Sequence, residues 1–275
     1  MNKINSKLSS RKKYLQIALN NTLDEAQLII ACLPISDQII IEAGTPLIKR
    51  YGLEGIKKIK TWYKLRLMGL RPGLPSNANQ WGGFPVNTLS FGGVLKSVFS
   101  SNQNSAFSSS QLDKADFYPY VVADLKMMDR GETEVDLAAQ AGADAATALG
   151  HAPIESLNAF IQKCEEVGID AMIDMMNVEY PLAVLRQLKK LPRVVILHRG
   201  VDEERLNKEK QLPLYEIKRI KGSYDMLIAV AGGDSLREAQ RAIFNDADIV
   251  VVWKSFFQSS ADTAKLAKEF LREVK

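Results

Sequence analysis

Three charged side chains follow a buried-strand pattern in the stretch VVADLKMMDRG, residues 121–131. The β-branched apolar run at its start is typical of a strand that is buried on both faces. Asp124, Lys126 and Asp129 come directly after this run and form a D-x-K-x-x-D pattern. Charges beside a buried strand are costly to desolvate, so we expect them to be paired or to serve a purpose. Such a cluster is typical of an active site, although a structural ion-pair network would leave the same pattern.

Other polar residues and a glycine pair occupy equivalent places, directly after further apolar runs. Carboxylates, imidazoles, a guanidinium and lysines carry acid–base and anion-binding chemistry if they meet in one cavity. A glycine pair leaves its backbone free for the close approach of an anion. Any single member could be an ordinary strand cap, and a lone histidine is more often structural than catalytic. The set is Asn20, Glu42, Asp124, Lys126, His151, Asp174, His198, Arg199, Gly232, Gly233 and Lys254.

Eight short apolar runs alternate with amphipathic helical patterns along the chain. This alternation favours parallel strands, because each connection crosses over through a helix. Eight such units predict an α/β fold, a single-domain (β/α)8 TIM barrel, whose active site lies at the C-terminal ends of the strands. An open doubly wound sheet is the alternative, but no G-x-G-x-x-G follows the first strand. The predicted strands are 14–19, 38–42, 120–124, 145–149, 171–174, 193–198, 226–230 and 248–252.

The composition fits a globular protein, since 46% of its 275 residues are apolar. We expect no transmembrane helix and no signal peptide, because no long apolar run occurs and none follows the basic N-terminus. The two cysteines, Cys32 and Cys164, predict reduced thiols and a cytoplasmic protein, and two histidines are too few to favour a zinc site. A net charge of +4 is too mild to indicate nucleic-acid binding.

Two segments lie outside the barrel pattern of residues 14–275. Residues 1–13 form a basic N-terminal tail, and residues 61–116 form an insertion between the second helix and the third strand. From residue 49 to residue 71, eight basic residues stand against one acidic residue, Glu54. An insertion that joins a helix to the next strand emerges at the N-terminal face of the barrel, away from the strand ends. Three interpretations stay open: a surface extension, an arm that binds a partner or a second copy, and contact with a membrane surface.

Together these motifs resemble the orotidine 5'-monophosphate decarboxylase superfamily. Within it, the sequence is most similar to the hexulose-phosphate branch, which contains 3-hexulose-6-phosphate synthase and 3-keto-L-gulonate-6-phosphate decarboxylase. The D-x-K-x-x-D pattern stands between the two most specific segments, which are IIEAGTPLIKRYG and LHRGVDEE. The likeness covers roughly residues 14–60 and 117–273. The segments that carry it are IIEAGTPLIKRYG, AGADAATALGHAP, IDMMNV, LHRGVDEE and IAVAGG.

The resemblance implies a Mg²⁺-dependent aldolase of the hexulose-phosphate synthase type. Such enzymes join formaldehyde to ribulose 5-phosphate through a 1,2-enediolate. Glu42 and Asp124 match the metal-binding carboxylates of the family, and hard oxygen ligands suit Mg²⁺. Lys126 matches a positive charge that lies beside the enediolate oxygens. His198 matches the histidine that transfers a proton.

Further roles follow from the same resemblance. Asp129 matches a residue that reaches into the active site of the neighbouring subunit, so the resemblance implies a homodimer. Arg199, next to the proton-transfer histidine, would orient substrate or water. The expected substrate-binding residues are Asn20, Asp174, Arg199, Gly232, Gly233 and Lys254.

Two departures from the family pattern bear on the substrate. The first strand ends in Asn20 where the family has Asp, so the side chain keeps its hydrogen bonds but loses a base and a charge. Trp253 and Lys254 stand where the family has a Gly-Arg pair, and lysine binds phosphate as a point charge without the arginine fork. Two alternatives therefore stay open: a decarboxylase-type relative acting on another sugar acid, and a weakened paralogue with a binding or scaffold role.

Overall fold

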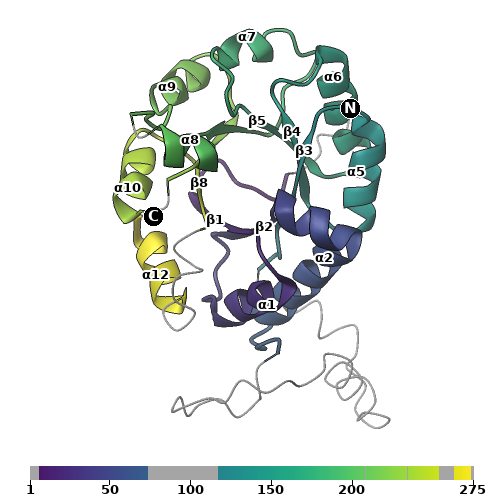
Figure 1. The fold of residues 1–275 in the computed structure, drawn as a ribbon, viewed down its shortest axis with the longest axis vertical. Coiled ribbons are helices and arrows are strands. Elements are labelled where there is room, and N and C mark those ends of the chain that lie inside the picture. Colours follow the sequence, from purple (N-terminus) through teal and green to yellow (C-terminus); the bar gives the residue numbers. More distant parts are fainter. Residues whose placement is uncertain (1–5, 74–116, 208, 234, 254–262, 274–275) are drawn as a thin grey trace.

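The computed structural model describes residues 6–73, 117–207, 209–233, 235–253 and 263–273. Within them, eight parallel strands close into one barrel, and helices form an outer ring around it (Figure 1). Strand β8 pairs with β1 and so completes the ring. The predicted (β/α)8 TIM barrel is therefore confirmed. The strands are β1 (Tyr14–Leu19), β2 (Ile39–Ala43), β3 (Val121–Met127), β4 (Ala145–Leu149), β5 (Asp170–Asp174), β6 (Val194–His198), β7 (Leu227–Ala231) and β8 (Ile249–Val252).

The end of β3 is the one place where a predicted strand differs clearly from the observed one. The strand continues to Met127 instead of ending at Asp124. Its pairing with β4 shifts register between Ala123 and Met127, so β3 carries a bulge at the D-x-K motif. Apolar run length predicts where a strand begins, but it carries no signal for an extra residue in one strand of a pair.

The helices follow the strands in the expected alternation and cover the outside of the barrel (Figure 1). Helix α2 takes in residues 61–67, the first part of the expected insertion, and is kinked at Gly52. Residues 68–73 of that insertion follow α2 as turns, and its remaining residues, 74–116, lie between α2 and β3 and outside the described residues. The described helices are α1 (Leu23–Cys32), α2 (Thr45–Leu67), α5 (Gly131–Gln140), α6 (Ile154–Val167), α7 (Pro181–Leu185), α8 (Val201–Leu206), α9 (Tyr215–Lys221), α10 (Leu236–Phe244) and α12 (Thr263–Glu273).

Side chains alternate between two apolar layers along each strand, as the two-residue period of a strand requires. On β1, Leu15 and Ile17 pack under the helices, whereas Tyr14 and Ala18 face the barrel interior. Interior positions are apolar through the middle of the barrel, apart from the buried Gln16 on β1, and become polar near the C-terminal ends of five neighbouring strands. These polar interior positions are Glu42, Asp124, Thr147, Asp174 and His198.

The described part of the N-terminal segment closes the opposite end of the barrel. Leu8 is buried in the interior cluster, and Ser6 donates a hydrogen bond of 2.8 Å to Asp170 at the start of β5. Lys7 pairs with the buried Asp144 at 2.8 Å. Residues 6–13 thus pack against the barrel, and the N-terminal face is held by apolar burial together with ion pairs.

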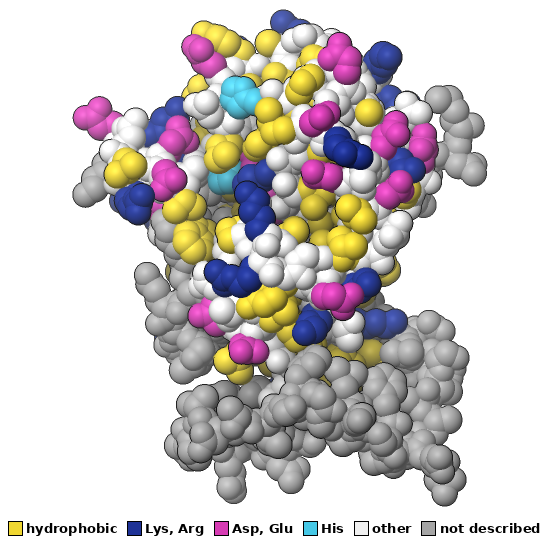
Figure 2. Space-filling view, turned by 45° about the vertical axis from the view of Figure 1, so that its right-hand side comes forward, with side chains coloured by type: hydrophobic (Ala, Val, Ile, Leu, Met, Phe, Trp, Pro, Cys, Tyr) yellow, Lys and Arg dark blue, Asp and Glu magenta, His cyan; other side chains and the backbone are white. Residues whose placement is uncertain are grey.

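The surface carries basic and acidic side chains interspersed with apolar ones over the face shown in Figure 2. Among the helices that the structure describes, none combines the length and the apolar character needed to cross a membrane.

Candidate active site

Asp174, at the end of β5, joins two of the predicted catalytic residues. Its Oδ2 atom lies 2.9 Å from Lys126 Nζ and 2.8 Å from His198 Nδ1. Its Oδ1 atom accepts a hydrogen bond of 2.9 Å from the backbone N–H of Met176. The Asp174 side chain is almost fully buried, so this carboxylate fixes a lysine and a histidine from two other strands in one place.

Asp124 is held by three side chains in the same cluster. The Lys126 ammonium lies 3.2 Å from its carboxylate, and the hydroxyl of Thr147 on β4 donates to Oδ1 at 2.8 Å. The hydroxyl of Thr45, at the start of α2, contacts Oδ2 at 2.7 Å, and the Thr45 N–H points at the same oxygen. The N-terminus of α2 therefore contributes both a backbone N–H and a side-chain hydroxyl to the contacts of this carboxylate.

Glu42 lies on the neighbouring strand, and its carboxylate accepts a hydrogen bond from the buried Gln16 amide. Burial, and next the charge of Asp124, raise the pKa of Glu42 to about 7. Among the described residues, nothing donates to the second oxygen of Glu42, and the buried Gln16 Oε1 has no hydrogen-bond partner. This side of the cavity therefore has oxygen atoms that are short of positive charge.

These oxygen donors fit a small divalent cation. Mg²⁺ takes one or two protein carboxylates and completes its octahedral shell with water and substrate oxygens. Glu42 and Asp124 supply that number of hard ligands, and a cation there would relieve the repulsion that raises the pKa of Glu42. Within the described residues, no group of three or more His, Cys, Asp or Glu is arranged to hold a metal by itself. The donor set therefore suits Mg²⁺ better than a metal that needs a closed cage.

The protonation states follow from the contacts. Burial alone would raise the pKa of Asp174, but His198 and Lys126 lower it to about 2. Burial lowers the pKa of His198, and the paired Asp174 outweighs this and raises it overall. The pKa of Lys126 is also raised, because Asp124 and Asp174 outweigh its burial. At neutral pH the cluster thus contains a fixed ammonium and a fixed carboxylate, beside an imidazole whose pKa Asp174 raises above its ordinary value.

Arg199 and the glycine pair form a separate arrangement after β6 and β7. Arg199 donates to the Gly232 carbonyl oxygen from Nη2 at 2.6 Å, and the same nitrogen lies 3.1 Å from Glu238 Oε1. Gly232 has φ +94°, and a Cβ there would lie 2.1 Å from the Arg199 carbonyl oxygen. Only glycine fits at this position. Arg199 is therefore engaged in holding the turn after β7, and its backbone and side chain lie directly against Gly232.

Asn20 and Trp253 lie at the same end of the barrel, beside β2 and β7. A Cβ on Gly44 would come within 1.8 Å of Asn20 Oδ1, so the Asn20 side chain sits directly over the start of α2. Trp253 follows β8, is partly buried, and packs against the interior cluster that includes Ala18 and Ala231. Its side chain therefore covers the apolar side of the barrel mouth. Lys254 lies outside the described residues.

Two other expected residues lie outside the hydrogen-bonded cluster. Asp129 is exposed in the turn after β3 and makes no ion pair within the described part of the chain. His151 is exposed, and its Nε2 atom lies 2.8 Å from the Asn177 carbonyl oxygen, which is the structural role that a lone histidine predicts.

Three residues of the site were missed at the level of sequence. Thr45, Thr147 and Gln16 all contact the predicted carboxylates. A signal existed for two of them. Gln16 and Thr147 are polar residues inside otherwise apolar runs, at positions that share the inward face of their strands. Thr45 gave no such signal, because a threonine before a proline at a helix start is ordinary capping chemistry.

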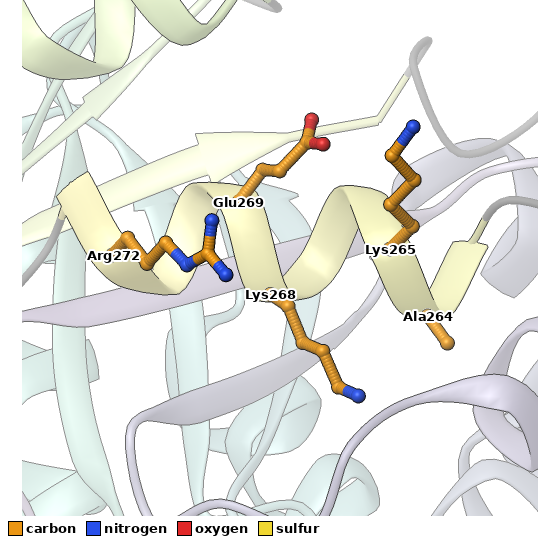
Figure 3. A pocket seen from close by; sticks show the side chains of 5 residues that line it. All are labelled: Ala264, Lys265, Lys268, Glu269 and Arg272. Atoms are coloured by element: carbon orange, nitrogen blue, oxygen red, sulfur yellow. The ribbon is translucent and has the colours of Figure 1, made fainter.

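A hollow of about 440 Å³ borders α12, away from the residues of the cluster. Its described lining consists of Ala264, Lys265, Lys268, Glu269 and Arg272, all from this one helix. Figure 3 shows these side chains leaving the helix in different directions. They do not converge on a common point, so we assign no chemistry to this hollow.

Known proteins resemble the chain in sequence. The model of the family described as Orotidine 5'-phosphate decarboxylase / HUMPS family matches residues 110–270. The Bifunctional enzyme Fae/Hps of Methanocella arvoryzae is 33% identical over 266 residues, covering 95% of this chain and 53% of that protein. The Fae/Hps enzyme of Methanosarcina barkeri is 32% identical over 262 residues, covering 95% and 52%. The chain spans about half the length of these curated relatives.

Solved structures share the fold. A 3-hexulose-6-phosphate synthase from Salmonella typhimurium superposes with a TM-score of 0.67 at 24% identity, covering 95% of this chain and 98% of that one. KGPDC from Streptococcus mutans superposes with a TM-score of 0.64 at 18% identity, covering 95% of this chain and 97% of that one. At these identities the likeness establishes a common barrel.

Proposed function

Because the chain belongs to the Orotidine 5'-phosphate decarboxylase / HUMPS family, we propose that it is an aldolase of the 3-hexulose-6-phosphate synthase type. It would join formaldehyde to ribulose 5-phosphate. The names of the Fae/Hps relatives support this choice within the family. The observation that carries it is the cluster in which Asp174 holds Lys126 and His198 beside Asp124 and Glu42.

His198 is the proposed general base. With the Nδ1 proton directed at Asp174, Nε2 is the basic nitrogen of the neutral imidazole. It takes a proton from C1 of ribulose 5-phosphate, and the electrons of the C–H bond give the 1,2-enediolate. C1 then attacks the carbon of formaldehyde and forms the new C–C bond. The proton returns from His198 to the former formaldehyde oxygen, so no other reactant is needed.

Lys126 is the proposed electrostatic partner of the enediolate. Its raised pKa keeps the ammonium charged at neutral pH, so it acts as a fixed positive charge and not as the base. Asp124 and Asp174 hold the ammonium before substrate arrives, so little reorganisation accompanies the chemical step. Glu42 and Asp124 would hold Mg²⁺, which supplies Lewis-acid stabilisation of the enediolate charge when bound.

The residues expected to bind the phosphate of the substrate leave a second candidate function open. The Gly232–Gly233 pair after β7, where Gly232 has a positive φ, is the kind of turn that can approach an anion, in keeping with a phosphorylated sugar. Trp253, however, fills interior space at the end of β8. A bulky indole there favours an unphosphorylated sugar acid, and hence a decarboxylase-type reaction. The synthase stays the first proposal because it uses every charged member of the cluster.

The test is an assay of the full chain with both proposed substrates. We expect formaldehyde and ribulose 5-phosphate to disappear in a one-to-one ratio, as followed by formaldehyde titration and by product NMR. Chelation by EDTA should lower the rate by at least about 100-fold, and added Mg²⁺ should restore it. Ribulose without phosphate is the control. If neither sugar is turned over while an unphosphorylated sugar acid loses CO₂, the second candidate replaces the synthase.

We also propose a homodimer in which Asp129 completes the site of the neighbouring subunit. Asp129 lies exposed just after the bulge of β3, and the preceding residue, Met128, exposes 44% of its surface. An exposed charge beside an exposed apolar side chain, close to the site, suits a contact with a second copy.

Light scattering should give about twice the chain mass of 30.6 kDa. Asp129→Asn and His198→Gln should each keep about 1% of wild-type activity or less when alone. Mixed, unfolded and refolded together, they should recover about a quarter of wild-type activity, because half of the dimers are mixed and each of these has one intact site. A monomer, or a mixture that stays inactive, would contradict the shared site.

A further inference from the structure

Thr147 connects the two halves of the D-x-K motif through a single hydroxyl group. Its Oγ1 atom donates a hydrogen bond to Asp124 Oδ1 at 2.8 Å and accepts one from the backbone N–H of Lys126 at 3.1 Å. Thr147 is 1% exposed and lies on β4, facing the barrel interior. No solvent competes at this depth, so both hydrogen bonds act in a medium where they are strong.

The backbone of Lys126 explains why such a connection is needed. Lys126 has φ +48°, in the left-handed region that a lysine rarely adopts. The register shift between Ala123 and Met127 takes the Lys126 N–H out of the regular pairing with β4. A buried N–H without a partner is unfavourable, and the Thr147 hydroxyl supplies the missing acceptor. The same hydroxyl therefore satisfies the bulge and orients the carboxylate two residues earlier.

Asp124 and Lys126 meet at this bulge. The Lys126 ammonium there bridges the carboxylates of Asp124 and Asp174. A left-handed residue of this kind persists only where its surroundings hold it, and such residues gather at functional sites. From β4, Thr147 holds the left-handed Lys126 in place through its hydrogen bonds to the Lys126 N–H and to Asp124.

We propose that Thr147 is a positioning residue, which holds the strained β3 bulge so that Lys126 and Asp124 meet the reacting atoms in fixed places. The expected change in kcat rests on the proposed aldolase function. The expected change in the positions of Lys126 and Asp124 does not depend on that function. Loss of the hydroxyl lets the Lys126 backbone relax, and the Lys126 ammonium then leaves Asp174. Substrate binding through other groups should change little, because Thr147 itself lies below the motif and has its hydroxyl fully engaged.

The kinetic test compares Thr147→Val, which keeps the shape and removes the hydroxyl, with Thr147→Ser, which keeps the hydroxyl. We expect Thr147→Val to lower kcat by about 10- to 100-fold with KM within about threefold, and Thr147→Ser to stay within about threefold of the wild type. Tyr63→Phe is the matched control. It removes another buried hydroxyl, which donates to the Ile39 carbonyl oxygen at 2.8 Å at the other end of β2. Equal losses of kcat in Thr147→Val and Tyr63→Phe would overturn the proposal.

A second readout needs no activity. The chain has two histidines, so the His198 ring can be followed by proton NMR and assigned with His151→Gln. The charged groups that act on His198 include Asp174, Lys126, Asp124 and Glu42, and of these Lys126 lowers its pKa. In Thr147→Val the ammonium moves away, so the pKa of His198 should rise, whereas Thr147→Ser and Tyr63→Phe should leave it unchanged. An unchanged value in Thr147→Val overturns the proposal even if the protein proves to have no aldolase activity.

Discussion

Replacing Asp124 with asparagine should lower kcat/KM by at least about a thousandfold. The Asp124 carboxylate pairs with Lys126, accepts hydrogen bonds from two threonine hydroxyls, and would also ligate the cation. Removal of a single preorganised electrostatic contact commonly lowers a rate by about 10²–10³, and this substitution removes more than one. Asparagine also turns an NH₂ group towards donors that it cannot satisfy.

Asp170→Asn is the matched control for this prediction. Asp170 is also buried and hydrogen-bonded, to Tyr120 at 2.6 Å and to Ser6 at 2.8 Å, but it lies at the N-terminal end of the barrel. We expect this variant to lose stability and to keep kcat/KM within about threefold. Steady-state kinetics and thermal unfolding should be measured on both variants. If Asp170→Asn is as inactive as Asp124→Asn at equal folded fractions, the effect of Asp124 is only structural.

Metal affinity gives a separate test of the same carboxylate. Titration with Mn²⁺, followed by electron paramagnetic resonance, should show a site that is weakened by about 100-fold in Asp124→Asn and also in Glu42→Gln. Equal affinity in the wild type and both variants would show that these carboxylates do not hold the cation, even if Asp124→Asn remains inactive.

The sequence predicted the barrel well because the barrel depends on a simple periodicity. Apolar runs mark the strands, and alternation then places the residue at each strand end on the inward face. Glu42, Asp124, Asp174 and His198 could be found in this way without knowledge of their contacts, and they do meet. The pairing of Asp174 with both Lys126 and His198 could not be found, because it depends on the distances between three different strands.

Residues that act through the backbone were harder to predict. The bulge at Lys126 and its support by Thr147 depend on a register shift, which leaves no trace in the hydrophobic pattern. The contacts of Arg199 were also beyond the sequence. Its guanidinium is engaged with the Gly232 carbonyl and Glu238, and the substrate contact that was expected of it stays a prediction. A sequence shows which side chains have the right chemistry, but only the structure shows which of their donors are already in use.

The second large effect is expected at His198, where glutamine should lower kcat by about 10²–10⁴-fold. Glutamine can fill the space and hydrogen-bond to Asp174 but cannot take up a proton. In the wild type, kcat/KM should rise with pH as the imidazole loses its proton, and the midpoint should lie above 6.5 because Asp174 outweighs burial and raises the pKa of His198. The measurement is a pH–rate profile of the wild type and of the residual activity in His198→Gln.

Asp174→Asn separates this titration from that of Glu42, whose pKa of about 7 falls in the same range. Without the carboxylate, burial and Lys126 both lower the pKa of His198. The part of the pH–rate profile that reports His198 should therefore move below pH 6.5. The pKa of Glu42 is shifted mainly by burial and by Asp124, so the part of the profile that reports Glu42 should not move. A profile identical to that of the wild type would exclude His198 as the titrating base.

The pKa shifts of Asp174 and His198 also predict how the free energy of unfolding should change with pH. The pKa of Asp174 is lowered, so its contribution is present above the unfolded value of about 3.9 and is lost as pH falls through about 2. The pKa of His198 is raised, so its contribution is present below about 6.5 and is lost as pH rises through the folded value. Asp174→Asn should therefore destabilise the barrel most between about pH 4 and 6.5, by on the order of 2–3 kcal/mol. Urea unfolding at pH 5 and pH 9 checks this, and a loss that is equal at both values would contradict the ion pair.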